Sequence, residues 1–208
     1  GMGCRFPGGV DDPDAFWRLL CEGRDGTGDV PSGRWDVDGF FDPRPGQPGK
    51  IVARRGGYLD QIDQFDAEFF GISPREASWM DPQQRLALEV AWEALEDAGL
   101  TVDRLRESLT GVFFGVSTFD YALLQAWHRA GGDPHQATGT AHSILTGRIS
   151  YLLDLLGPSV PVDTACSSSL VALHYACESL RAGEVGHQRI VEHHARRAVA
   201  AQALGRLA

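Results

Sequence analysis

Apolar residues recur at helical spacing over residues 82–98, and residues that start and stop helices bound this stretch. Asp81 stands where an N-cap belongs, Pro82 takes the first helical position, and Gln84 is placed to complete a capping box. Gly99 ends the pattern. The stretch therefore predicts a largely buried helix, with apolar positions in two neighbouring strips: Leu86, Val90 and Ala94, and Leu88, Trp92 and Leu95.

Three other stretches carry helix signals. One helix is predicted from the cap Asp12 and Pro13 to Gly23, a short one begins at Ser73-Pro74, and another spans 138–156. Residues 24–57 are rich in Gly, Pro, Arg and Asp and predict an irregular surface loop. The residues expected to face inward are Phe16, Leu19 and Leu20 in the first helix, and Leu145, Ile149, Leu152 and Leu156 in the last.

Two short apolar runs, at 111–116 and 158–162, predict strands, the first of them buried. The second run is followed by a helix that ends at Gly183. Strands thus alternate with helices, which indicates an α/β fold. The apolar residues expected to form the buried face of this last helix are Leu170, Leu173, Cys177 and Leu180.

Composition narrows the class of protein. The 43% hydrophobic and 23% charged residues are typical of a soluble globular protein, and no apolar run approaches the roughly 20 residues of a membrane span. No basic start precedes an apolar stretch, so we expect neither a membrane anchor nor a signal peptide. The net charge of −9 argues against nucleic-acid binding. The irregularly spaced Cys4, Cys21, Cys166 and Cys177 predict no disulfide framework and no metal site, and favour a cytoplasmic protein.

Cys166 is the candidate for chemistry because it lies where the strand at 158–162 turns into the following helix. Unpaired N–H groups at a helix start favour a thiolate, which is the nucleophilic form. The serines at 167–169 have small side chains that would let an acyl group approach, and their hydroxyls could cap the helix. On spacing alone, a small buried cysteine in a common type of turn remains the alternative.

The string DTACSSSL at 163–170 resembles the active-site segment of β-ketoacyl synthases, in particular the ketosynthase domains of modular type I polyketide synthases. Residues 1–9 resemble the family's GMxCRFPGG segment, and residues 80–85 resemble its MDPQQR motif. The resemblance implies a thiolase-like α/β fold, of which this chain would be the N-terminal half of a layered αβαβα architecture, incomplete. It also implies that Cys166 accepts an acyl chain and that a decarboxylative Claisen condensation with a malonyl-type extender follows.

The resemblance further implies the partners. An acyl carrier protein would bring acyl and malonyl-type thioesters on its phosphopantetheine, with no cofactor or metal bound directly by this chain. A homodimer is expected through the strand at 158–165, and no nucleic acid or membrane is expected as a partner. Two alternatives stay open: a non-catalytic remnant or dimerisation module, and a cysteine hydrolase, for which DTACSSS lacks the G-x-C-x-G-like elbow.

The resemblance covers 1–185, and it implies that the family's first strand, expected before Gly1, is missing. Residues 186–208 hold four Arg and one Glu, which gives them a net charge of +3, whereas the rest of the chain carries −12. They are expected to be a non-family tail, out of frame or artificial. The alternative is a metal or base cluster of His187, His193 and His194. The family's HGTGT-type and later GH-containing histidine motifs are absent, so we expect acyl loading without condensation. We also expect the missing half to leave apolar faces of the helices at 82–98 and 145–156 uncovered.

The remaining histidines are weighed as possible bases for Cys166. His128 and His135 fall in a polar stretch and are expected to be solvated. His142 and His174 flank predicted helices near the DTACSSSL segment, and a packed or capping role is favoured for both over a catalytic one.

Overall fold

The computed structural model describes residues 1–128 and 132–186. These residues form two compact units, 4–61 and 1–3 with 62–186, and each unit is described by itself. The predicted tail from residue 187 onward, with His187, His193 and His194, lies outside the described residues.

The unit of residues 4–61 contains α1 (Pro13–Cys21), β1 (Gly28–Asp29), α2 (Val37–Phe40) and β2 (Arg55–Gly56). The predicted cap of α1 is confirmed, because Asp12 Oδ1 accepts a hydrogen bond from the N–H of Ala15 at 2.7 Å. Phe16 is half-buried and stacks on Phe6, but Leu20 is exposed, so its predicted inward position is wrong. The predicted loop at 24–57 contains the antiparallel pair β1–β2 and the helical turn α2.

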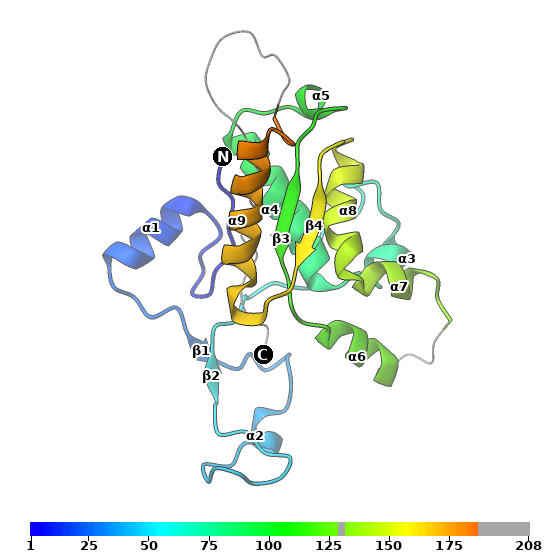
Figure 1. Cartoon of the computed structure of the whole chain (residues 1–208). Helices are drawn as coiled ribbons and strands as arrows, with labels where there is room; N and C mark the ends of the chain where they lie inside the picture. Colours follow the sequence, from blue (N-terminus) through cyan, green and yellow to red (C-terminus); the bar gives the residue numbers. More distant parts are fainter. Residues whose placement is uncertain (129–131, 187–208) are drawn as a thin grey trace. The chain divides into compact units, whose positions relative to one another are not determined.

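The larger unit is built on the parallel strands β3 (Val112–Gly115) and β4 (Ser159–Val162), as both apolar runs predicted. Val112 lies opposite Ser159 and Gly115 opposite Val162, and the two strands run side by side in Figure 1. The helices of this unit are α3 (Pro74–Ala77), α4 (Pro82–Asp97), α5 (Val102–Leu105), α6 (Asp120–His128), α7 (His135–Thr140), α8 (His142–Leu152) and α9 (Ser168–Ala182), with the 3-10 turn η1 (Ala165–Ser167) before α9.

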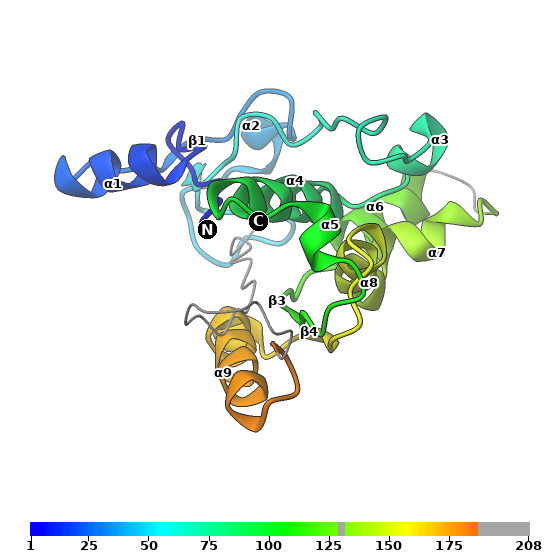
Figure 2. The ribbon, with the colours of Figure 1, turned by 90° about the horizontal axis from the view of Figure 1, so that it is seen from above.

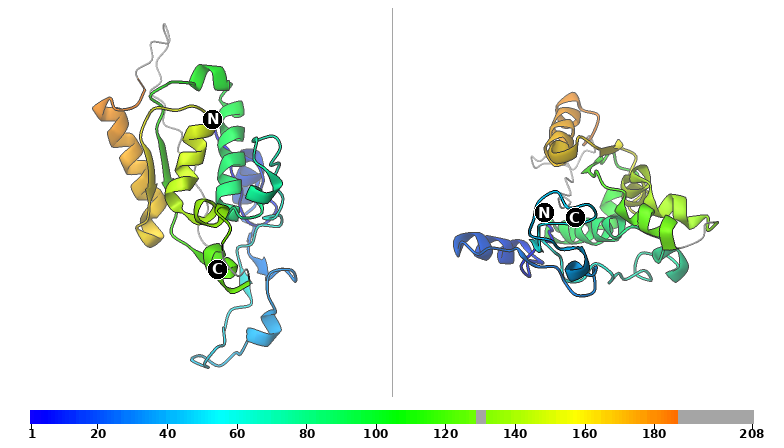
Figure 3. Two further views of the ribbon diagram at one scale, coloured as in Figure 1. Left: turned by 90° about the vertical axis from the view of Figure 1, so that its right-hand side faces the viewer. Right: turned by 90° about the horizontal axis from the view of Figure 1, so that it is seen from below.

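Helices cover both faces of the strand pair. Figure 2 shows α9 on one face and α8 with α4 on the other, and the side view in Figure 3 shows the same layers. Side chains alternate between the faces of a strand, so neighbouring residues enter different clusters. Phe113 packs with Val162, Ala172 and Ala176 towards α9, whereas Phe114 packs with residues of α4 and α8.

The start of α4 confirms one prediction and corrects another. Asp81 is the N-cap, and its Oδ1 accepts a hydrogen bond from the N–H of Gln83 at 2.8 Å. Gln84 does not complete a capping box. Its buried side-chain amide donates to the carbonyls of Thr138 and Ala141, both at 3.2 Å, and its Oε1 accepts from Nε of Arg148 at 2.9 Å. Gln84 therefore fixes the chain between α7 and α8.

The helix predicted over 138–156 is interrupted at Ala141, whose backbone is extended. The interruption lies where the carbonyls of Thr138 and Ala141 accept hydrogen bonds from Gln84. The carbonyl of Gly139 accepts a further hydrogen bond from the N–H of Asp81 at 2.8 Å. Leu145 and Ile149 are buried as predicted, but Leu156 lies beyond the end of α8 and is exposed.

The buried face of α9 differs from the predicted one. Leu170 and Leu173 are 69% and 47% exposed, whereas the buried residues are Ser168, Ala172, Ala176 and Ser179. The reason is close packing: a Cβ placed on Gly115 of β3 would lie 2.6 Å from the backbone nitrogen of Ser169. Only small side chains fit between a helix and a strand at that separation. The predicted end of the helix at Gly183, with φ +75°, is confirmed.

Candidate active site

Cys166 is exposed in the one-turn η1, directly between the carboxyl end of β4 and the amino end of α9. The preceding residue, Ala165, has φ +53°, a left-handed backbone that a residue with a Cβ rarely adopts. The predicted position of the thiol between a strand and a helix is therefore confirmed. The positive φ of Ala165 shows that the turn is strained.

Hydrogen bonds within the segment 163–168 hold this turn. Asp163 Oδ1 accepts from the N–H of Ala165 at 3.0 Å, and Ser168 Oγ accepts from the N–H of Thr164 at 2.9 Å while it donates to the carbonyl of Ala165 at 2.7 Å. Ser167 Oγ donates to the carbonyl of Thr164 at 2.9 Å. Ser167, the residue before α9, makes no side-chain cap. The hydroxyls at 167 and 168 therefore stabilise the turn instead of capping the helix as predicted.

The first turn of α9 lies directly against β3. This approach is possible because Gly115 has no side chain, and a Cβ added there would clash with the backbone of α9. Alpha-helices carry backbone N–H groups without helical partners at this end, and such groups favour negative charge. The 15-residue α9 begins two residues after Cys166, so the thiol lies beside a helix terminus of this kind.

The loop that follows β3 begins at the same edge of the strand pair. The N–H of Val116 donates a hydrogen bond to the carbonyl of Val162 at 3.0 Å, so these two residues are neighbours at the ends of the strands. Phe119 follows Val116 by three residues, and Cys166 follows Val162 by four. Nε2–H of His142 donates to the carbonyl of Thr118 at 2.9 Å, and the imidazole stacks on the Phe119 ring with centroids 4.0 Å apart. Phe119 is not among the residues predicted from the sequence, where its only signal is an aromatic residue in a polar turn.

The structure confirms some of the predictions for the four histidines and contradicts others. His142 is packed, as predicted, through its stacking and its hydrogen bond. His174 is instead exposed on α9, with its ring 5.9 Å from that of Tyr175. His128 is exposed as predicted, although it ends α6 instead of lying in a loop, and His135 is only half-buried at the start of α7.

Asp81, the N-cap of α4, is buried and lies near His142. Burial raises the pKa of Asp81 above its ordinary value of 3.8, and the hydrogen bonds from Gln83 and the nearby His142 and Arg85 act in the opposite direction. The Nε2 of Gln83 also donates to the carbonyl of Thr118 at 3.4 Å, so this cap is connected to the Phe119 loop.

The other thiols lie in different surroundings. Cys4 is buried, Cys177 is half-buried on α9, and Cys21 is exposed at the end of α1. Within residues 1–128 and 132–186, no three side chains of His, Cys, Asp or Glu are grouped so that they could hold a metal ion. In the same part of the chain, no helix is both long and apolar enough to span a membrane.

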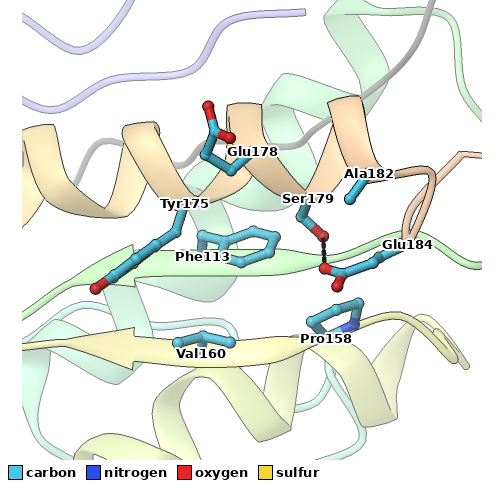
Figure 4. Close-up of a pocket in the computed structure, with 8 residues that line it drawn as sticks. All are labelled: Phe113, Pro158, Val160, Tyr175, Glu178, Ser179, Ala182 and Glu184. Carbon is cyan, nitrogen blue, oxygen red and sulfur yellow. Dashed lines mark hydrogen bonds between the residues drawn. The ribbon is translucent and has the colours of Figure 1, made fainter.

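A cavity of about 390 Å³ lies away from the Cys166 turn, between α9 and the strands (Figure 4). It is bounded on the α9 side by the second half of the helix and Glu184, which accepts a hydrogen bond from Ser179 Oγ at 2.9 Å. No residue of the 163–168 turn lines it. The full lining is Phe113, Pro158, Val160, Tyr175, Glu178, Ser179, Ala182 and Glu184.

Comparison with known proteins gives the family. The family model described as "Beta-ketoacyl synthase, N-terminal domain" matches residues 1–187. The chain is 54% identical over 184 residues to a component of the phenolphthiocerol/phthiocerol polyketide synthase of Mycobacterium tuberculosis, and 55% identical over 184 residues to a spectinabilin polyketide synthase protein of Streptomyces orinoci. These alignments cover 88% of the chain but only 10% and 8% of the two relatives.

Solved structures agree. An oxazolomycin ketosynthase domain from Streptomyces albus matches with a TM-score of 0.80 at 43% identity, over 88% of this chain and 32% of that one. The ketosynthase from module 6 of the bacillaene synthase of Bacillus subtilis matches with a TM-score of 0.76 at 37% identity, over 89% of this chain and 29% of that one. The protein therefore belongs to the β-ketoacyl synthase family, among the ketosynthase domains of polyketide synthases, and its α/β fold is thiolase-like.

Proposed function

We propose that Cys166 is the acyl-accepting nucleophile of a polyketide ketosynthase. The observation that carries the proposal is the position of this exposed thiol in a strained turn between β4 and the amino end of α9. A nucleophile on such a turn is accessible to a large substrate, while the hydrogen bonds at 163–168 limit its movement. Membership of the β-ketoacyl synthase family supports the same assignment.

The proposed chemistry begins with transfer of an acyl group. The thiolate of Cys166 attacks the thioester carbonyl of an acyl chain on an acyl carrier protein, the bond to the phosphopantetheine sulfur breaks, and the departing thiolate takes up the proton that Cys166 lost on ionisation. A malonyl-type extender on a carrier protein then loses carbon dioxide, and its carbanion attacks the acyl carbonyl. The new carbon–carbon bond releases the Cys166 thiolate and leaves a β-ketoacyl thioester on the carrier.

We further propose that residues 1–185 provide the ketosynthase portion and that 186–208 form a separate tail, a boundary two residues before the end of the family-model match at residue 187. Condensation needs placed donors for the charge that develops on the extender's thioester oxygen, and losing one such donor costs about a hundredfold or more in rate. The 208 residues contain no HGTGT-type sequence to supply a catalytic histidine. This polypeptide is therefore expected to load an acyl group and not to extend it.

The test offers acyl thioesters to the 208-residue polypeptide and measures covalent acylation by intact mass and peptide mapping. Acylation at Cys166, and its loss in Cys166→Ala, is the expected result. Cys21→Ala is the matched control, because Cys21 is also an exposed thiol but lies at the end of α1. Faster labelling of Cys21 than of Cys166 would contradict the assignment, and a β-ketoacyl product from added malonyl-carrier protein would refute the expected lack of extension.

The homodimer is proposed at β4. In the described residues β4 pairs only with β3, so its other edge has no strand partner, and exposed edges tend to pair with further strands. Pro161 lies in β4 and lacks an N–H, as is common in edge strands. A second copy of the chain is the proposed partner at this edge.

A further inference from the structure

We propose that Ser168 is a positioning residue for Cys166, because its buried hydroxyl keeps Ala165 in the left-handed conformation that directs the thiol to the surface. The inference rests on the proposed role of Cys166. The first observation is the burial of this serine: residues 163–167 of the turn are all exposed, whereas Ser168 is only 4% exposed. A buried hydroxyl requires hydrogen-bond partners, and the bonds of Ser168 Oγ stay inside the turn.

The second observation is that these bonds lie on both sides of Ala165. Ser168 Oγ accepts from the N–H of Thr164 at 2.9 Å, before Ala165, and donates to the carbonyl of Ala165 at 2.7 Å, after its Cα. That carbonyl and the N–H of Cys166 belong to one planar peptide group, so the bond also fixes the orientation of the peptide that enters the nucleophile. Asp163 Oδ1 accepts from the N–H of Ala165 at 3.0 Å, which holds the preceding peptide group as well.

The third observation is that Ala165 has a backbone conformation that alanine does not prefer. Its φ of +53° brings the Cβ close to the backbone, and negative φ values become favourable once the hydrogen bonds are lost. The chain after the turn cannot move to absorb such a change, because a Cβ on Gly115 of β3 would lie 2.7 Å from the carbonyl carbon of Ser168. A relaxation of Ala165 would therefore displace the residues between these two fixed points, which are Cys166 and Ser167.

The consequence for the reaction is geometric. Ser168 acts on the thiol through the backbone of Ala165, and attack on a thioester carbonyl depends on the position of the sulfur, since a misplacement of about 1 Å can cost about a hundredfold in rate. Ser167 differs from Ser168 in this respect. Its hydroxyl bonds to the carbonyl and to the hydroxyl of Thr164, both before Ala165, so these bonds do not span the strained residue.

The experiment measures the rate at which the acetyl thioester of N-acetylcysteamine acylates Cys166 in the full 208-residue chain, by intact mass and peptide mapping. Ser168→Ala is expected to lower this rate about tenfold, as a misplacement of less than about 1 Å would cause. Ser179→Ala is the matched control, because Ser179 is a buried serine of the same helix, and its hydroxyl donates to Glu184 at 2.9 Å. Equal slowing by the two substitutions would assign the effect to the loss of any buried hydrogen bond in α9 and overturn the inference.

A rescue by glycine distinguishes positioning from stability. Glycine adopts positive φ about as readily as negative φ, so Ala165→Gly combined with Ser168→Ala is expected to acylate to within about threefold of the parent rate. Unfolding in urea is measured for both variants, because glycine at position 165 cannot replace the hydrogen bonds of the lost hydroxyl. A double variant that is acylated as slowly as Ser168→Ala would overturn the positioning role.

A second substitution, Ala165→Val, tests the same conformation without touching the buried serine, and it replaces Ser168→Ala if that variant does not fold. The side chain at position 165 is exposed, and a β-branched residue rarely adopts a positive φ. Ala165→Val is therefore expected to lower the acylation rate about tenfold as well. A rate equal to that of the unmodified chain would show that the conformation of Ala165 does not control the thiol, against the inference.

Alkylation of Cys166 by iodoacetamide separates the possible failures. If iodoacetamide labels Cys166 but the thioester does not acylate it in the unmodified chain, the proposed function fails. The positioning role is then measured by alkylation alone: slower labelling in Ser168→Ala that Ala165→Gly restores supports it, and equal labelling in all three chains overturns it. If the thioester acylates Cys166 and Ser168→Ala does not slow this reaction, the inference fails while the role of Cys166 stands.

Discussion

At the scale of single residues, Gly115 determines how closely α9 approaches β3. Any side chain there would meet the backbone of Ser168 and Ser169, which cannot move without displacing α9. Gly115→Ala is therefore expected to destabilise the fold by about 1–3 kcal/mol, the usual cost of overpacking. The free energy of unfolding in urea, or the melting temperature, measures this change.

Gly147→Ala is the control for this substitution. Gly147 lies within α8, and a Cβ added there would meet nothing within 4 Å. Alanine favours a helix over glycine by about 0.8–1.0 kcal/mol, so this variant should be as stable as the parent or more stable. Equal stability of the two variants would show that the contact between Gly115 and α9 does not constrain the fold.

At the scale of helices, the N-cap of α4 connects stability to pH. Because burial raises the pKa of Asp81 above 3.8, the folded chain holds this proton more tightly than the unfolded chain does. The resulting stabilisation is complete below pH 3.8 and is lost as the pH rises through the folded pKa. Asp81→Asn retains a cap oxygen and does not titrate, so its stability relative to the parent should increase from about pH 4 to about pH 7.

Asp81→Ala distinguishes the cap from the charge. It removes both, and loss of the cap alone costs about 1 kcal/mol of helix stability. Chemical denaturation at a series of pH values checks both variants. Parallel stability curves for the parent and Asp81→Asn would show that Asp81 does not titrate differently in the folded state.

The helix starts could be predicted because a cap is a local signal. Asp12, Ser73 and Asp81 each precede a proline and each accept a backbone hydrogen bond at the start of a helix. The face of α9 could not be predicted in this way, because Leu170 is as apolar as a core residue and only the contact with Gly115 selects the small residues for burial. Gln84 was misassigned for the same reason, since its partners are 54 and 57 residues away.

The site was partly predictable for similar reasons. The strand-to-helix position of Cys166 follows from neighbouring residues, so the sequence reveals it. Phe119 is 47 residues away in the chain, and only the pairing of β3 with β4 brings its loop to the same edge. Pairing between distant strands leaves no local mark in the sequence.

At the scale of the whole molecule, several large apolar side chains are exposed. The expected uncovered faces on α4 and α8 are wrong, because α4 is largely buried and Leu145 and Ile149 of α8 are buried. Apolar side chains are instead exposed on α9, at Leu170 and Leu173. Apolar groups of this size on a surface favour association. We expect the 208-residue polypeptide to form dimers or larger aggregates at micromolar concentration, as measured by light scattering.

Substitutions on α9 distinguish the two kinds of association. Leu170→Glu combined with Leu173→Glu should reduce large aggregates and leave a dimer formed through β4. Arg181→Glu changes an exposed charge on the same helix and is the control. A monodisperse monomer of the unmodified chain would refute both the proposed dimer and the expected aggregation.

The closed hydrogen bonding of the 163–168 turn has a consequence for how such a protein can evolve. The side chains of Asp163, Ser167 and Ser168 bond within that segment, whereas the Phe119 loop is supported from α4 and α8. Mutations that reshape the support of the Phe119 loop leave the hydrogen bonds of the Cys166 turn untouched. The loop after β3 can therefore change its conformation between related domains while the geometry of the Cys166 turn is retained.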